Sequence, residues 1–164
     1  MTDAEISSLL KVFEPVGRRS HLVRPIVELA LATAMRCGEL LALRWENINF
    51  QARTAFLPST KNGDSRTVPL SSRALDVLDN IQRHISGAVF PMNASALNAS
   101  FKRGLSRSGL KDIRFHDLRR TAITKMAEKL PNVIELAAVS GYKSLLVLKQ
   151  YYRPSASELA TKLG

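Results

Sequence analysis

The spacing of apolar residues changes between Ile48 and Leu70, and this change constrains the fold more than any other feature of the sequence. Outside this region apolar residues recur every three or four positions, as they do on one face of an α-helix. Inside it, two short runs, Thr54–Leu57 and Arg66–Pro69, flank Asn62-Gly63, a dipeptide typical of hairpin turns. The sequence therefore predicts a mainly α protein with a small antiparallel β-hairpin or sheet, an α+β fold.

Local signals predict where the helices begin and end. Thr2 and Glu5 have the spacing of a capping box, which predicts a helix through Phe13. A helical pattern runs from Pro25, a residue suited to the first helical position, to Trp45, with a break expected at Gly38. Further helices are expected over Ser72–His84 with Ile85 on the apolar face, from Ser95, over Phe115–Leu130, over Val133–Val139 with Gly141 ending it, from Ser144 through both tyrosines, and over Ser155–Leu163.

The composition is that of an ordinary globular domain. The 164 residues, 45% hydrophobic and 23% charged, are enough for one packed core, so we expect residues 1–164 to form a single domain. No apolar run approaches the roughly 18 residues of a membrane span, and no signal peptide is expected. The single Cys37 fits a reducing, cytoplasmic setting. Because the sequence has no cluster of metal-ligand residues, neither a metal site nor another cofactor is expected.

The charge balance indicates a polyanionic partner. Twenty-four Lys and Arg residues against fourteen Asp and Glu residues leave a net charge of +10. Such an excess favours nucleic acid, because each neutralised phosphate releases condensed counterions. The alternative is a generally basic protein whose charges are only solvated.

Arg36 lies in an apolar stretch, where an unpaired guanidinium would be costly. Glu39, three residues later, is positioned to pair with it on a helix. The pair has two interpretations: a structural ion pair, or a rigid guanidinium fork oriented to bind a phosphate.

His116 and Arg119 are also three residues apart and are expected on one helical face. Arg119 borders the apolar stripe that contains Ala122 and Ile123, which predicts a half-buried cation. Together the two side chains have the chemistry to surround a phosphate, although a helix-capping histidine is the commoner role. Arg120 points elsewhere and is expected to face solvent or a DNA backbone.

Two further features are ambiguous by themselves. Lys61 lies at the predicted hairpin tip, where a lysine is usually a soluble turn residue but is also able to protonate a leaving alkoxide. Tyr151 and Tyr152 have the spacing of core or interface aromatics. A nucleophilic role requires one of their hydroxyl groups to face the arginines.

Four segments together resemble the tyrosine recombinases, the phage integrase family. They are Ala-Met-Arg-Cys-Gly-Glu-Leu-Leu-Ala-Leu-Arg-Trp (34–45), Thr-Lys-Asn-Gly (60–63) with Arg-Thr-Val-Pro-Leu (66–70), His-Asp-Leu-Arg-Arg-Thr (116–121), and Ser-Gly-Tyr-Lys-Ser (140–144) upstream of Tyr151. The likeness extends from Pro25 to about Leu163, and it implies the catalytic-domain fold of that family.

The resemblance implies a role for most of these side chains. Arg36 would be the first catalytic arginine with Glu39 as its supporting acid, and Arg119 would be the second. His116 would be the family's histidine, and Lys61 would be the hairpin lysine that protonates the leaving oxygen.

The resemblance also identifies a nucleophile and a departure from the family pattern. Tyr151 lies where the nucleophile is expected, nine residues after position 142, and Tyr152 is the weaker candidate on that spacing. The family usually has His or Trp where this chain has Tyr142, which retains a hydroxyl donor of different reach and shape. Nothing resembles the family's amino-terminal clamping domain, so a catalytic domain alone is expected.

The implied function is site-specific recombination or integration of double-stranded DNA through a 3′-phosphotyrosyl intermediate, without metal or another cofactor. Such enzymes work as homotetramers on paired sites, whereas an isolated domain can be monomeric. Residues 155–163 would be either a segment donated to a neighbour or one that docks within its own chain. The alternatives are a type IB topoisomerase-like enzyme, a DNA-binding relative that has lost catalysis, and an RNA-binding domain. Residues assigned to the DNA backbone are Arg107, Lys111, Arg120 and Lys143.

Overall fold

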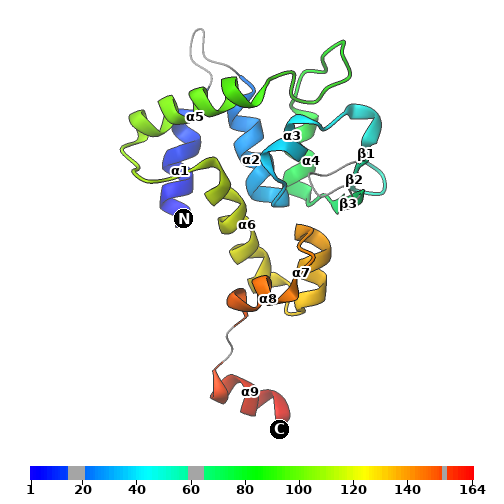
Figure 1. Ribbon diagram of the computed structural model, residues 1–164, viewed down its shortest axis with the longest axis vertical. Helices are drawn as coiled ribbons and strands as arrows, with labels where there is room; N and C mark the ends of the chain where they lie inside the picture. Colours follow the sequence, from blue (N-terminus) through cyan, green and yellow to red (C-terminus); the bar gives the residue numbers. More distant parts are fainter. Residues whose placement is uncertain (15–20, 59–64, 153–154) are drawn as a thin grey trace.

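The computed structural model describes residues 1–14, 21–58, 65–152 and 155–164, and it confirms a mainly helical fold with a small antiparallel sheet (Figure 1). In chain order the elements are α1 (Asp3–Val12), α2 (Val23–Thr33), α3 (Cys37–Leu41), the 3₁₀ turn η1 (Trp45–Asn47), β1 (Ile48–Asn49), β2 (Thr54–Leu57), β3 (Arg66–Pro69), α4 (Ser72–Asp79), α5 (Ala94–Ser108), α6 (Phe115–Lys129), α7 (Val133–Ser140), α8 (Leu145–Leu148), the 3₁₀ turn η2 (Lys149–Tyr151) and α9 (Ala156–Leu163).

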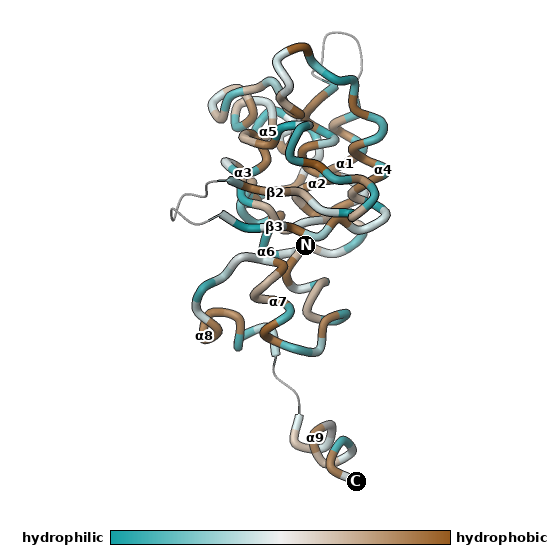
Figure 2. The backbone as a smooth tube through the Cα atoms, turned by 90° about the vertical axis from the view of Figure 1, so that its right-hand side faces the viewer, coloured by the Kyte–Doolittle hydropathy of each residue, from teal (hydrophilic) through white to brown (hydrophobic). Residues whose placement is uncertain are grey.

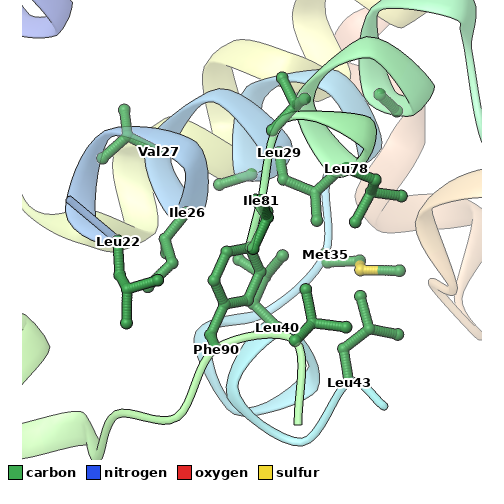
Figure 3. Packing of buried hydrophobic residues seen from close by; sticks show 14 of the residues in the cluster. Leu22, Ile26, Val27, Leu29, Met35, Leu40, Leu43, Leu78, Ile81 and Phe90 are labelled. Atoms are coloured by element: carbon green, nitrogen blue, oxygen red, sulfur yellow. The ribbon is translucent and has the colours of Figure 1, made fainter. Parts of the chain in front are cut away.

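Helix α2 is the centre of the main body. It contacts α1, α3, α4, α5 and α6, and its side chains Ile26 and Leu29 are completely buried. Figure 3 shows them packed with Met35, Leu40 and other apolar side chains from α3, α4 and the segment before α5. Each such side chain contributes about 1.5–3 kcal/mol by leaving water. This core holds the beginning of α3 in place beside the sheet.

Strand β2 pairs with both neighbours in an antiparallel sheet ordered β1-β2-β3. The β2–β3 register, from Thr54 opposite Pro69 to Leu57 opposite Arg66, matches the predicted hairpin strands. Strand β1 was not predicted, because two residues are too short for a periodic pattern. Side chains alternate along β3, so Arg66 and the buried Val68 point to the same face.

Several helix ends confirm the local signals. The capping box between Thr2 and Glu5 forms in full. Helix α6 covers almost the whole predicted range, and α7 ends at Gly141, whose φ of 69° is the left-handed conformation that glycine adopts without steric cost.

The break within the predicted helix from Pro25 to Trp45 lies earlier than expected. Helix α2 ends at Ala34, which has a φ of 55°, and α3 restarts at Cys37, so Gly38 is inside a helix and Pro25 is third in α2. The reason is the carboxylate of Glu39, which accepts the backbone N–H of Arg36 at 2.7 Å and starts α3 there.

Other predicted boundaries were wrong. Helix α4 stops at Asp79, and Ile85 is fully exposed instead of lying on an apolar face. The side chain of Asn93, not Ser95, caps α5 by accepting the N–H of Ala96 at 2.8 Å. The helix predicted after Ser144 is a single α-turn followed by η2, which ends at Tyr151.

The last helices form a smaller unit below the main body. A second apolar cluster consists of Ala34, Ala122, Ile123, Leu136 and Leu148, and the three tyrosines of the chain pack against it. Figures 1 and 2 show α7 and α8 beneath the body, with α9 standing apart from both. No helix of the described residues has the length and apolar character needed to cross a membrane.

The packing of α1 against α5 yields a stability prediction. A Cβ atom at Gly104 would lie 2.1 Å from Cε1 of Phe13, so Gly104→Ala forces the ring to move. We expect a loss of about 1–3 kcal/mol in the free energy of unfolding. Urea denaturation followed by circular dichroism measures it. Gly38→Ala, a helical position with no atom within 4 Å of the added Cβ, is the matched control and is expected to be neutral or stabilising. Equal midpoints for the two variants would contradict this interpretation.

Candidate active site

Three arginines from distant parts of the chain converge on the end of α7. Arg66 Nη1 donates to the carbonyl of Val139 at 2.8 Å, Arg119 Nη2 to that of Ser140 at 2.7 Å, and Arg36 Nη2 to that of Gly141 at 3.3 Å. The last carbonyls of a helix lack partners within it and carry partial negative charge. Consecutive carbonyls therefore bring three guanidinium groups to one place.

Arg36 is held on two sides. It lies at the N-cap of α3, and its Nη1 donates to Glu39 Oε1 at 3.0 Å in the ion pair expected from their spacing. The other side of the guanidinium reaches Gly141. Its side chain retains 28% of its exposure, so a ligand outside the protein can reach it.

Arg119 is more deeply buried than the half-buried cation predicted from the sequence, with only 2% of its surface exposed. Its Nη1 donates to the carbonyl of Ala34 and its Nη2 to Ser140. Burial lowers the pKa of Arg119, the positive charge of Arg36 lowers it further, and Tyr142 and Glu39 oppose the change. The two guanidinium groups are thus close enough to repel each other, which an anion between them would relieve.

The ring of Tyr142 lies over this buried cation. The guanidinium carbon of Arg119 is 4.8 Å from the ring centroid, which is cation–π geometry. Tyr142 directly follows Gly141, the C-cap of α7, so its backbone lies at the end of that helix.

The structure distinguishes the two adjacent tyrosines. The hydroxyl of Tyr152 donates to the carbonyl of Leu130, with the carbonyl of Asn132 at 3.3 Å. Burial and then the charge of Glu135 raise the pKa of Tyr152. Tyr151 is partly exposed, and its hydroxyl has no hydrogen bond within the described part of the chain. Tyr151 therefore has the available hydroxyl.

The remaining predicted residues are placed less tightly. His116 is exposed on the first turn of α6, one turn before Arg119, and makes no hydrogen bond or ion pair among the described residues. Lys61 lies outside the described residues. The structure thus brings Arg36, Glu39, Arg119 and Tyr142 together, with His116 one turn away along α6.

Sequence reasoning missed Arg66 as a member of this cluster. Its Nη2 donates to Glu39 Oε2 at 2.9 Å and its Nε to Oε1 at 3.2 Å. The alternation along β3 was a usable signal, because it turns position 66 inward with Val68, and a buried arginine needs a carboxylate partner. Arg36 and Arg66 share the carboxylate of Glu39, whereas Arg119 donates to backbone carbonyls, so the three guanidinium groups and this carboxylate together retain a net positive charge suited to a phosphate.

The residues assigned to the DNA backbone are all exposed. Arg107 Nη2 lies 3.3 Å from the carbonyl of Val12, and Arg120, with 68% side-chain exposure, lies 4.0 Å from Asp117. Lys143 directly follows Tyr142, and Lys111 lies between α5 and α6.

Within the described ranges, no group of three or more His, Cys, Asp or Glu side chains is arranged to hold a metal.

Residues 1–158 match the family model described as the phage integrase family. The chain is 41% identical over 164 residues to the shufflon-specific DNA recombinase of Escherichia coli, a match that covers 99% of this chain and 42% of that protein. This chain spans less than half the length of the first curated relatives it matches.

Solved structures show the same fold. The catalytic domain of bacteriophage HP1 integrase has a TM-score of 0.77 and 24% identity, with 99% of this chain and 92% of that chain covered. The Tn1549 transposon integrase in complex with circular intermediate DNA has a TM-score of 0.79 and 18% identity, with 100% of this chain and 64% of that chain covered.

Proposed function

Because the chain belongs to the phage integrase family, we propose that it is a catalytic domain that breaks and rejoins DNA strands through a 3′-phosphotyrosyl intermediate. One observation carries the proposal. Arg36 and Arg119, which are 83 positions apart in the sequence, bind the consecutive carbonyls of Gly141 and Ser140, so their guanidinium groups meet at the end of α7. Two guanidinium groups at one place are suited to bind the non-bridging oxygens of one phosphodiester.

The arginines would act mainly on the transition state. A phosphodiester carries one negative charge, and its pentavalent transition state concentrates more charge on the non-bridging oxygens. Since hydrogen bonds to carbonyls already fix both guanidinium groups, little reorganisation is needed as the charge develops. Arg119 would be the buried part of the phosphate site and Arg36 its accessible part.

Tyr151 would attack the phosphorus, and the bond from phosphorus to the 5′ oxygen would break. A phenol with a pKa near 10 is a weak nucleophile until its proton is accepted, and exposed His116 is the candidate acceptor. Lys61 would give a proton to the departing 5′ oxygen. The phosphotyrosyl bond keeps the energy of the broken phosphodiester, so rejoining needs no ATP and no metal.

The assembly and the DNA contacts are proposed on the same basis. Double-stranded DNA is the proposed substrate, with Arg107, Lys111, Arg120 and Lys143 contacting phosphates, in the cytoplasm. The relatives named above are recombinases and integrases, which favours strand exchange over topoisomerase-like relaxation. We also propose a tetramer on paired sites. It is supported by α9, which stands apart from the body (Figure 1) and whose exposed Leu159 and Leu163 are available to pack against a neighbour.

The test is the capture of a covalent protein–DNA adduct. A pool of nicked duplexes with a randomised core is incubated with the chain, and adducts that survive SDS are recovered, sequenced and mapped by mass spectrometry. We expect a single modified peptide containing Tyr151. Binding of the duplex pool without any adduct would instead support a DNA-binding relative that has lost catalysis. Relaxation of supercoiled plasmid by the monomer would support the topoisomerase-like alternative.

Tyr142 provides a separate prediction. Replacing it with Leu removes the ring over Arg119, and we expect cleavage to slow about ten-fold, since a desolvated cation–π contact contributes up to about 2 kcal/mol. Tyr142→Phe keeps the ring and is expected to retain most of the rate. Single-turnover adduct formation measures both. If Phe is as slow as Leu, the hydroxyl rather than the ring is the contributing group.

A further inference from the structure

We propose that Arg66 is a positioning residue of this site: it holds Glu39 against Arg36 and ties strand β3 to the end of α7. The inference rests on the proposed function and adds a residue to it. Arg66 is not expected to touch the phosphate, because its three nitrogens donate to protein oxygens, namely both oxygens of Glu39 and the carbonyl of Val139.

The contact between Arg66 and Glu39 is bidentate. Nε and Nη2 lie 3.2 and 2.9 Å from the two carboxylate oxygens, a fork-to-fork arrangement that fixes the plane of the carboxylate. The Glu39 side chain is 3% exposed and that of Arg66 13%, so water competes little for either. The same carboxylate oxygens accept from Arg36, one from Nη1 and one from the backbone N–H. The orientation of Arg36 therefore depends on Arg66 through Glu39.

The charge state of Glu39 depends on the same contact. Burial raises the pKa of Glu39, but hydrogen bonds from the Arg66 side chain and the Arg36 backbone, together with both positive charges, outweigh burial and leave this pKa below its usual value. Without Arg66, the buried carboxylate would lose its bidentate partner and hold Arg36 less rigidly.

Arg66 also contacts the segment that leads to the nucleophile. Its Nη1 binds Val139 in the last turn of α7, and a Cβ atom at Gly141 would lie 2.8 Å from its Nε. The end of α7 thus lies directly against this guanidinium. From this end the chain continues to Tyr142, α8 and Tyr151. Arg66 therefore links the positions of Arg36 and of Tyr151.

The first test is the variant Arg66→Gln. Its probe is the set of nicked duplexes that the unmodified chain captured in the adduct selection. We expect the single-turnover rate of adduct formation to fall about 100-fold, since small misplacements of reacting groups have effects of this size, while the Kd for the duplex changes less than three-fold. A purely structural role would lower the melting temperature and leave the rate per folded molecule unchanged.

A second variant, Arg66→Lys, keeps the charge without the planar guanidinium group and is expected to be nearly as slow. It serves as the reporter if the Gln variant does not fold. Arg44→Gln removes an arginine from the exposed pair with Glu46 and is the matched control, expected to react at the unmodified rate.

A double-mutant cycle with Glu39→Gln tests the route of the effect. If Arg66 acts through Glu39, the double variant is expected to be little slower than the slower single variant. The inference would be overturned if the rate losses of the two single variants multiplied in the double variant. It would also be overturned if folded Arg66→Gln or Arg66→Lys reacted at the unmodified rate. Failure of the unmodified chain to form any adduct would instead overturn the proposed function, so the two failures are distinguishable.

Discussion

Tyr151→Phe is expected to abolish covalent adduct formation while leaving the affinity for DNA within about five-fold of the unmodified chain. The substitution removes only the nucleophilic oxygen. That hydroxyl makes no hydrogen bond within the described part of the chain, so its loss leaves no protein group unpaired. A single hydrogen bond to DNA would contribute only about 1 kcal/mol to binding. SDS-resistant adducts on nicked duplexes and a fluorescence-anisotropy Kd measure the two quantities.

Tyr152→Phe is the matched control for this experiment. It removes the adjacent hydroxyl, which donates to the carbonyl of Leu130. We expect this variant to lose about 1 kcal/mol of stability and to form the adduct. The reverse result, an adduct with Tyr151→Phe and none with Tyr152→Phe, would move the nucleophile by one residue and contradict our interpretation of the two hydroxyl groups.

Arg119→Lys is expected to slow adduct formation by about 10²–10³-fold, the loss observed when one preorganised donor to a developing oxyanion is removed. The ammonium group keeps the charge but is unable to reproduce the planar fork that reaches both Ala34 and Ser140. One of these carbonyls would lose its partner, and no rigid donor would remain for the phosphate. Single-turnover rates with saturating DNA separate this loss from weaker binding.

Two further variants support the interpretation of Arg119→Lys. Arg44→Lys changes an exposed arginine that pairs with Glu46 and is assigned neither to the site nor to DNA, and it is expected to have little effect on the rate. Arg36→Lys changes the more accessible member of the pair and is expected to be as slow as Arg119→Lys. A folded Arg119→Lys protein that reacts at the unmodified rate would exclude Arg119 from the phosphate site.

Much of the local structure could be predicted because its causes are short-range. The capping box at Thr2, the stripe of α6 and the glycine after α7 depend on residues within a few positions of one another. The pairing of Arg36 with Glu39 has the same origin, since three residues separate them. Wrong boundaries occurred where two signals competed, as at Asn93 and Ser95, or where a side chain started a new helix, as the Glu39 carboxylate does for α3.

The sequence by itself determined the helical class, the hairpin, the ion pair of α3 and the residue types available for the proposed phosphate chemistry. Only the tertiary structure decided that Arg36, Arg66 and Arg119 meet at the last carbonyls of α7, that Arg119 is fully buried beneath Tyr142, and that Tyr152 rather than Tyr151 is bound to the backbone. The physical reason is that a guanidinium accepts any oxygen of suitable geometry. Its partner is therefore set by how helices and strands distant in the chain pack, and no local pattern records that packing.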